Sequence, residues 1–253
     1  MTKVVFNGCS FTVGEGFPLE QRNDYIYDRL VASHYSFKAD NIAVGGSSNY
    51  KIFMRSCQAL LSGQYDIIFT QWSALNRIWL SPGPDSVFFT NDVKYPDFQY
   101  RNIYLSKKDK DQLRNSLLLL NHDYQNILDL VEYCHILENL AKNSKTKLVF
   151  INGLVPWTND LTRPISNNLG KSLSDYTKDI LDFELRDDEE IIKFFTELQK
   201  MFLTLNQKSW VNIFDSFDSN TIDVGPEGHH PGIQSHRQMA TQIINYIDTN
   251  KIL

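Results

Sequence analysis

Short apolar runs alternate along the chain with longer segments in which apolar residues recur every three or four positions. Five runs have the length and composition of buried strands, at residues 4–6, 41–44, 66–72, 147–153 and 210–214. Helical spacing is found at 20–34, 113–140, 188–205 and 232–247, and in the segment that begins at Ser47 or Ser48. Because strands alternate with helices, the sequence predicts an α/β fold with a mostly parallel sheet of five strands and helices on both faces.

Two long segments interrupt this alternation. Residues 79–110 hold three prolines and many aromatic side chains, and residues 155–187 are mostly polar. Both are longer than ordinary connections between strands and helices. We therefore expect a single domain over residues 1–253, with two insertions above the edge of the sheet where the strands end.

Glycine and polar residues follow four of the expected strands. They lie at residues 8–10, 45–46, 71–73 and 152–153. The carboxyl ends of parallel strands meet at one edge of a sheet, and ligand sites of open α/β sheets lie outside that edge. These four segments are therefore expected to converge on one site.

Composition limits the class of protein. Of the 253 residues, 42% are hydrophobic and 22% are charged, which is typical of a globular protein. The formal net charge of −5 argues against a nucleic-acid partner, since such proteins normally carry a basic surface. No run approaches the roughly 18 apolar residues of a membrane span. No pattern in the chain indicates an oligomeric state.

The N-terminus and the cysteines bear on localisation. The first residues lack the apolar core and cleavage site of a signal peptide. Cys9, Cys57 and Cys134 have no metal-ligand spacing and cannot all pair within one chain. We expect reduced thiols in a cytoplasmic protein. A component of a phage particle, released by lysis, would lack a signal peptide in the same way.

Candidate chemistry lies near the two ends of the chain. Ser10 follows the first strand, and Glu227 and His230 stand three residues apart just before the last helix. A hydroxyl nucleophile, an imidazole base and an acid that holds the imidazole are the requirements of a serine hydrolase. His229 is the less favoured histidine, and Asp223 is the alternative acid.

Four segments, in chain order, resemble the sequence blocks of the SGNH (GDSL-type) hydrolase superfamily. They are Gly8-Cys9-Ser10-Phe11-Thr12, the segment 41–49, the triplet Gln71-Trp72-Ser73, and Glu227-Gly228-His229-His230-Pro231. The resemblance implies the three-layer fold of that superfamily, with a flavodoxin-like sheet. It also implies Ser10 as nucleophile, His230 as base, Glu227 as acid, and Gly46 as a backbone donor to the oxyanion hole.

Three positions depart from the family pattern. Cys9 stands where the family has aspartate, and Glu227 stands where it has aspartate in Asp-x-x-His. The third block of the family supplies an asparagine to the oxyanion hole, whereas Ser73 occupies that place here. Either the Ser73 hydroxyl or the side chain of Asn76 is therefore the expected third donor.

The resemblance implies hydrolysis of an acyl ester, and together with the aromatic insertions it favours an acetyl ester on a saccharide. Trp72 and Trp157 are candidates for a saccharide platform. The alternative is a binding or assembly module on the same fold, such as a phage-particle or glycan-binding component, in which the altered third block marks weakened chemistry. We expect no cofactor and no metal, because the remaining histidines lie in helical stretches without ligand partners.

Overall fold

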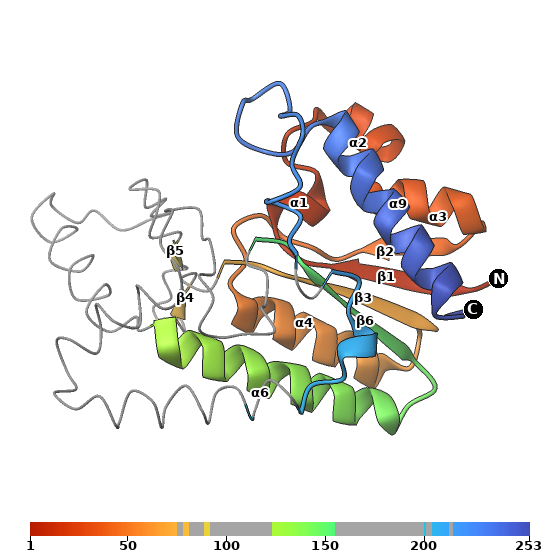
Figure 1. The fold of residues 1–253 in the computed structure, drawn as a ribbon, viewed down its shortest axis with the longest axis vertical. Coiled ribbons are helices and arrows are strands. Elements are labelled where there is room, and N and C mark those ends of the chain that lie inside the picture. Colours follow the sequence, from red (N-terminus) through yellow and green to blue (C-terminus); the bar gives the residue numbers. More distant parts are fainter. Residues whose placement is uncertain (75–77, 81–88, 92–122, 155–199, 201–203, 213–214) are drawn as a thin grey trace, which may run out of the picture.

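The structure is a computed structural model of the chain. It describes residues 1–74, 78–80, 89–91, 123–154, 200, 204–212 and 215–253 (Figure 1). Asn76, Trp157, the insertion 155–187 and most of the predicted helix 188–205 lie outside these residues. Of the first insertion, the structure describes β4 (Ile78–Leu80) and β5 (Phe89–Asn91), which pair as antiparallel strands.

A parallel sheet forms the centre of the described fold. Its strand order is β2-β1-β3-β6, made of β1 (Lys3–Asn7), β2 (Lys38–Asn41), β3 (Ile67–Trp72) and β6 (Lys147–Asn152). Every residue of β3 is buried, as expected for a strand covered on both faces by helices. β1 and β3 pair in parallel, with Val4, Val5 and Phe6 opposite Ile67, Ile68 and Phe69.

The predicted fifth strand is reduced to a bridge. Trp210 pairs with Phe150 in parallel orientation, beside the short 3-10 helix η1 (Gln207–Ser209). Residues 213–214, the end of the predicted strand, lie outside the described part of the chain. The sheet of the described residues thus has four strands, one fewer than predicted, and the three-layer α/β class is confirmed.

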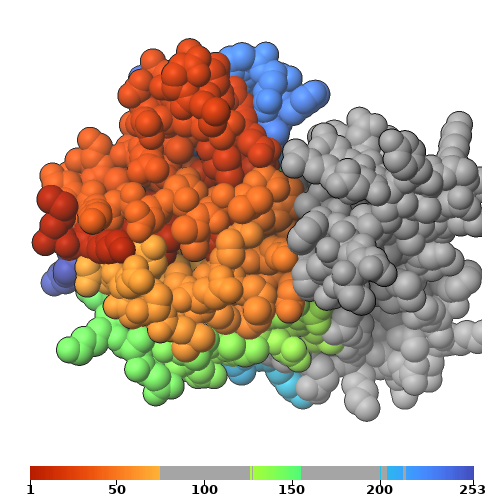
Figure 2. All heavy atoms as spheres, turned by 180° about the vertical axis from the view of Figure 1, so that it is seen from behind, coloured from red at the N-terminus to blue at the C-terminus, as the bar shows by residue number. Residues whose placement is uncertain are grey.

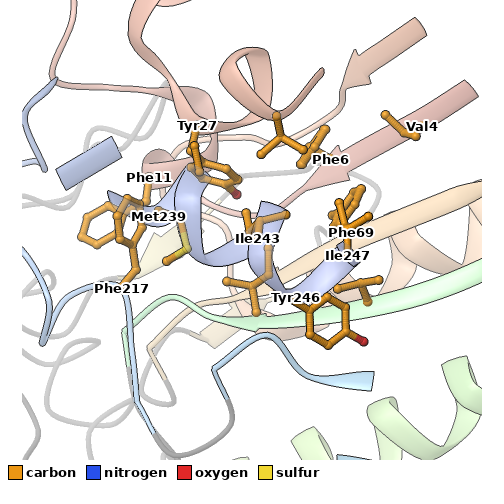
Figure 3. Packing of buried hydrophobic residues seen from close by; sticks show 14 of the residues in the cluster. Val4, Phe6, Phe11, Tyr27, Phe69, Phe217, Met239, Ile243, Tyr246 and Ile247 are labelled. Carbon is orange, nitrogen blue, oxygen red and sulfur yellow. The ribbon is translucent and has the colours of Figure 1, made fainter. Parts of the chain in front are cut away.

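Helices cover both faces of the sheet (Figure 1). One face carries α1 (Ser10–Val13), α2 (Leu19–Tyr25), α3 (Tyr27–Tyr35) and α9 (Ile233–Thr249), and the other carries α4 (Asn49–Ser62) and α6 (Asp123–Lys142). A hydrophobic core lies on each face of the sheet, and alternate residues of β1 point into one or the other. Val5 packs with α4 and α6, whereas Val4 and Phe6 pack with α9. Figure 3 shows the second core, where Phe6 and Phe69 of the sheet lie near Ile243 and Ile247 of α9.

Two element boundaries differ from the sequence prediction near the site. The predicted helix 20–34 is broken at Ile26, whose backbone is extended between α2 and α3. Ile26 is buried against Gly14, where any side chain on the glycine would collide with it. The second strand covers Lys38–Asn41 instead of 41–44, so that Asn41 is its last residue, paired with Phe6. As a result, the side chains of Ile26 and Asn41 both contact the segment that contains α1.

Within the described residues, no helix is long and apolar enough to cross a membrane.

Candidate active site

Ser10 lies at the carboxyl end of the central strand β1, as the first residue of α1. Cys9 before it is extended and buried, and Gly14 ends the helix in the left-handed region at φ 73°. Ser10 itself is only 3% exposed. Gly8 permits this sharp turn, because a side chain there would collide with Thr12. The strand-to-helix turn therefore holds the serine at the edge of the sheet where a site was expected.

A buried polar network supports this turn from behind. The Thr12 hydroxyl hydrogen-bonds to Gln71 of β3 and accepts a hydrogen bond from the Tyr27 hydroxyl at 3.0 Å. The Asn41 amide donates to the Thr12 carbonyl at 2.7 Å and to the Asp28 carboxylate at 2.9 Å. Burial raises the pKa of Asp28 to about 6, against the opposing effects of Arg29 and the Asn41 hydrogen bond.

The loop after β2 approaches the same edge. Gly46 has φ 69°, a left-handed conformation that favours glycine, and the Ser47 amide closes a turn on Val44. Ser48 then caps α4 by accepting a hydrogen bond from the Lys51 amide. This geometry fits the tight strand-to-helix turn that the sequence predicts, with Gly46 at its tip.

Arg55 of α4, which sequence reasoning missed, ties the two loops together. Its guanidinium donates to Asn7 Oδ1 at 2.9 Å, to the Gly8 carbonyl at 3.1 Å and to Ser47 Oγ at 2.8 Å. Burial lowers the pKa of Arg55 to about 10, which leaves it charged at neutral pH. One guanidinium thus links the end of β1 to the loop that carries Gly46. The only sequence signal was an arginine next to the buried face of an apolar helix.

The third block contributes Ser73, which follows β3. Its amide donates to Asn49 Oδ1 at 2.7 Å, and the residue is 2% exposed. Its hydroxyl is buried and has no hydrogen-bond partner among the described residues. A buried hydroxyl without a partner is costly, so such a group is often explained by a ligand or a catalytic role.

Trp72 does not lie where a saccharide platform requires it. Its side chain is 1% exposed and packs with Phe150 at a ring-centroid distance of 5.7 Å. It belongs to the core between the sheet and helices α4 and α6. The expectation that Trp72 contacts substrate is therefore corrected, because β3 is buried on both faces and its indole points into one of them.

His230 and Glu227 lie on a tight turn before α9. Val224 and Pro231 form an antiparallel bridge, the Gly225 amide donates to the His230 carbonyl at 2.7 Å, and Gly228 has φ 78°. This turn places the Glu227 carboxylate on Nδ1 of His230. A carboxylate at Nδ1 leaves Nε2 as the nitrogen that can exchange a proton with a nucleophile. His229, by contrast, is exposed.

The turn that carries His230 packs against the segment that carries Ser10. The ring of His230 meets that of Phe11 edge-on, with centroids 5.9 Å apart. Gly225 lies so close to Gly16 that a side chain on it would meet the Gly16 carbonyl oxygen at 2.7 Å. Figures 1 and 2 show the segment before α9 beside the residues that follow β1. Among the described residues, however, no hydrogen bond joins Ser10 to His230.

Asp223, the alternative acid, is engaged elsewhere. Its carboxylate accepts hydrogen bonds from the amides of Gln234 at 3.0 Å and Ser235 at 2.8 Å, and from the Ser235 hydroxyl at 2.6 Å. Burial alone would raise its pKa, but these hydrogen bonds lower it. Asp223 therefore caps the N-terminus of α9, and the geometry favours Glu227 as the acid.

His236 of α9 is buried and takes part in packing. Its Nδ1 accepts a hydrogen bond from the Tyr27 amide at 3.3 Å, and its ring stacks on Tyr27. Burial lowers its pKa to about 4, so the ring is neutral at physiological pH. His236 thus lies near the site as a core residue.

Glu15 is a second residue that sequence reasoning missed. Its Oε2 lies 3.9 Å from Nε2 of His230, and its side chain is 40% exposed. A carboxylate therefore faces each nitrogen of this imidazole. No sequence signal marked Glu15, which stands between two glycines after α1.

Comparisons with known proteins give only distant likenesses. No family model and no curated protein matches the chain. Among solved structures, the crystal structure of TesA has 10% identity and a TM-score of 0.47, covering 98% of this chain and 99% of that one. A putative lipolytic protein of the G-D-S-L family from Desulfitobacterium hafniense has 11% identity and a TM-score of 0.44, with full coverage of both chains. An acetyl xylan esterase from Butyrivibrio proteoclasticus has 13% identity and a TM-score of 0.45, covering 100% of this chain and 65% of that one. Because these TM-scores are below 0.5, these likenesses carry no part of the functional proposal.

Proposed function

We propose that the protein is a serine esterase of the SGNH (GDSL) type that hydrolyses an acyl ester. The observation that carries the proposal is the turn that fixes Glu227 on Nδ1 of His230 and packs this histidine against Phe11, the residue after Ser10. The resemblance of the four sequence blocks supports the same assignment. An acetyl ester on a saccharide is the first substrate to test.

The proposed reaction begins when Ser10 Oγ attacks the ester carbonyl while Nε2 of His230 takes its proton. Glu227 holds Nδ1 and stabilises the imidazolium that forms. The tetrahedral intermediate expels the alcohol, which receives the proton from Nε2, and an acyl-enzyme remains on Ser10. Water then attacks the acyl carbon with His230 as base, releasing the acid and restoring the serine.

The oxyanion of the tetrahedral intermediate requires donors that point at its oxygen. We assign this role to the backbone amides of Ser10 and Gly46 and to the Ser73 hydroxyl, which is buried and has no other partner in the described part of the chain. Losing one such donor typically lowers turnover by about 10²–10³-fold. Asn76 is the alternative donor. The Ser10–His230 hydrogen bond must form in the substrate complex, where such contacts commonly tighten.

A fluorophosphonate probe tests the nucleophile directly. We expect the wild-type protein to be labelled at Ser10 and to hydrolyse 4-nitrophenyl acetate, and Ser10→Ala to lose both properties. Ser62→Ala removes a hydroxyl whose hydrogen bond is local to the end of α4 and serves as the matched control. For the base, His229→Ala should retain most of the activity that His230→Ala removes.

One observation favours a second candidate, a binding or assembly module on the same fold, such as a phage-particle or glycan-binding component. In the described residues, Nε2 of His230 faces Glu15 and makes no hydrogen bond to Ser10. A wild-type protein that is neither labelled by the probe nor active on nitrophenyl or saccharide acetates at high enzyme concentration would replace the esterase proposal with this one.

A further inference from the structure

The carboxylate of Glu15 lies between three parts of the site. It follows Gly14, the residue that ends α1, so it extends from the nucleophile segment. Its Oε2 is 3.9 Å from Nε2 of His230. On its other side it lies against Gly45, where any side chain would collide with the carboxylate. Glu15 thus contacts the base on one side and the glycine turn of the oxyanion loop on the other.

The structural surroundings of Glu15 give it no other role. Its backbone amide donates to the Ser10 carbonyl at 3.0 Å, but its carboxylate receives no hydrogen bond from any described residue. Within the described residues, its only ionisable neighbour at ion-pair distance is His230. The position at Nδ1 that a triad acid needs is already taken by Glu227. A partly exposed carboxylate beside Nε2 therefore remains free to meet a substrate.

A carboxylate at this place discriminates between substrates by charge. An ionised carboxylate only accepts hydrogen bonds, so it suits hydroxyl or ammonium groups and repels anions. The proton that Nε2 carries moves between Ser10 and the leaving alcohol, so groups of a reacting ester pass close to Nε2 and thus to Glu15. Repulsion between two negative charges about 4–6 Å apart at a partly solvated site weakens the binding of an anionic ester by roughly tenfold or more relative to a neutral one.

We propose that Glu15 is a specificity-determining residue of the esterase and restricts it to neutral or cationic esters that offer hydroxyl or ammonium donors near the scissile bond. This inference rests on the proposed function. It adds a substrate class: esters of polyhydroxylated alcohols are accepted, and esters that carry a carboxylate or phosphate beside the carbonyl are rejected.

The test compares two esters of nearly equal size and different charge. The neutral ester is 4-nitrophenyl methyl succinate, and the anionic one is mono-4-nitrophenyl succinate. The quantity measured is the ratio of kcat/KM for the neutral ester to that for the anionic ester. We expect this ratio to exceed about ten in the wild type and to fall about tenfold in Glu15→Gln. High salt should lower the wild-type ratio in the same direction, because ions screen a partly exposed charge.

Glu20→Gln is the matched control. Glu20 is exposed in the first turn of α2, and its removal changes the net charge by the same amount without a contact to His230. Its ratio should equal that of the wild type. If Glu20→Gln lowers the ratio as much as Glu15→Gln does, the effect is one of net charge and the inference is overturned.

The outcomes separate this inference from the function on which it rests. If the wild-type enzyme is active but its ratio of kcat/KM values is the same in Glu15→Gln, the specificity role is overturned and the esterase proposal stands. The same conclusion follows if the wild-type ratio does not change with salt. Loss of activity on both esters in a folded Glu15→Gln variant assigns Glu15 to proton transfer and also overturns the specificity role. Wild-type protein that hydrolyses neither ester and is not labelled at Ser10 overturns both proposals.

Discussion

Replacing Asp28 with asparagine is expected to stabilise the protein above about pH 6. Asp28 is fully buried in α3, behind the turn that carries Ser10. One carboxylate oxygen accepts a hydrogen bond from Asn41 at 2.9 Å, and the other has no partner among the described residues. The nearest cation is Arg29, whose Nε lies 3.6 Å away and whose side chain is partly exposed. A charge in this place is poorly compensated.

The magnitude follows from the pKa of Asp28. Burial raises it from 3.8 to about 6, so between these values the folded protein holds a proton that the unfolded chain has lost. The contribution of Asp28 to the free energy of unfolding is therefore highest below about pH 4 and falls as pH rises through about 6, by roughly 3 kcal/mol in all. Asparagine removes this loss and can still accept the Asn41 hydrogen bond. The attraction to Arg29 is already included in this pKa. The amide nitrogen that replaces the unpartnered oxygen has no acceptor among the described residues, which costs about 1 kcal/mol and leaves a gain of about 2 kcal/mol at pH 8.

Urea denaturation followed by circular dichroism at pH 4.5 and pH 8 measures this effect. At pH 8 the asparagine variant should also melt about 4–8 °C above the wild type. At pH 4.5, where Asp28 of the folded protein is protonated, most of the advantage should disappear. Asp24→Asn, a change at an exposed position of α2, serves as the control and should show no such pH dependence. An equal difference from the wild type at both pH values would refute the reasoning, because the buried carboxyl would then not titrate as described.

The remaining predictions concern the site. Ser10→Ala and His230→Ala should each lower kcat by about 10⁴-fold or more, and the double variant no further, since both act as one unit; losses that multiply would contradict the shared role. Glu227→Gln should lower kcat by about 10–10³-fold with little change in KM, less than Ser10→Ala does, because a backbone carbonyl can hold the same tautomer. Asp223→Asn should lower the melting temperature by about 2–4 °C through loss of a helix cap and leave kcat nearly unchanged; a silent Glu227→Gln with an inactive Asp223→Asn would move the acid to Asp223. Arg55→Met should lower kcat/KM by about 10–10²-fold, because the two loops that Arg55 joins lose their common hydrogen-bond donor. An unchanged kcat/KM in steady-state assays would show that these contacts do not affect the site.

The layers of the fold could be predicted because their signals are local and strong. Val4-Val5-Phe6 and Ile67-Ile68-Phe69 are unbroken apolar runs, which is the pattern of strands covered on both faces. The bounds of the second strand could not be predicted from apolar residues. The paired register of β2 with β1 ends at Asn41, opposite Phe6, and Val44 is left 52% exposed in the loop that follows.

The site was predictable only where its geometry depends on neighbours in sequence. A four-residue turn suffices to bring Glu227 onto His230, so their spacing pointed to the pair. Arg55 and Glu15 act on loops that come from other strands, and only the folded chain shows those contacts. Trp72 shows the opposite error: an aromatic side chain at a strand end suggested a saccharide platform, whereas the burial of β3 on both faces directs its indole into the core.

The two acids of the C-terminal loop divide two tasks that one residue could not perform. The first turn of α9 needs an acceptor for its amides, and Asp223 supplies it with both carboxylate oxygens. An acid so occupied cannot also face an imidazole. The Val224–Pro231 bridge closes a turn beyond this cap, and the left-handed Gly228 allows it to fold back so that Glu227 reaches His230. The cap fixes where α9 begins, and the turn built on it fixes His230 relative to the segment that carries Ser10.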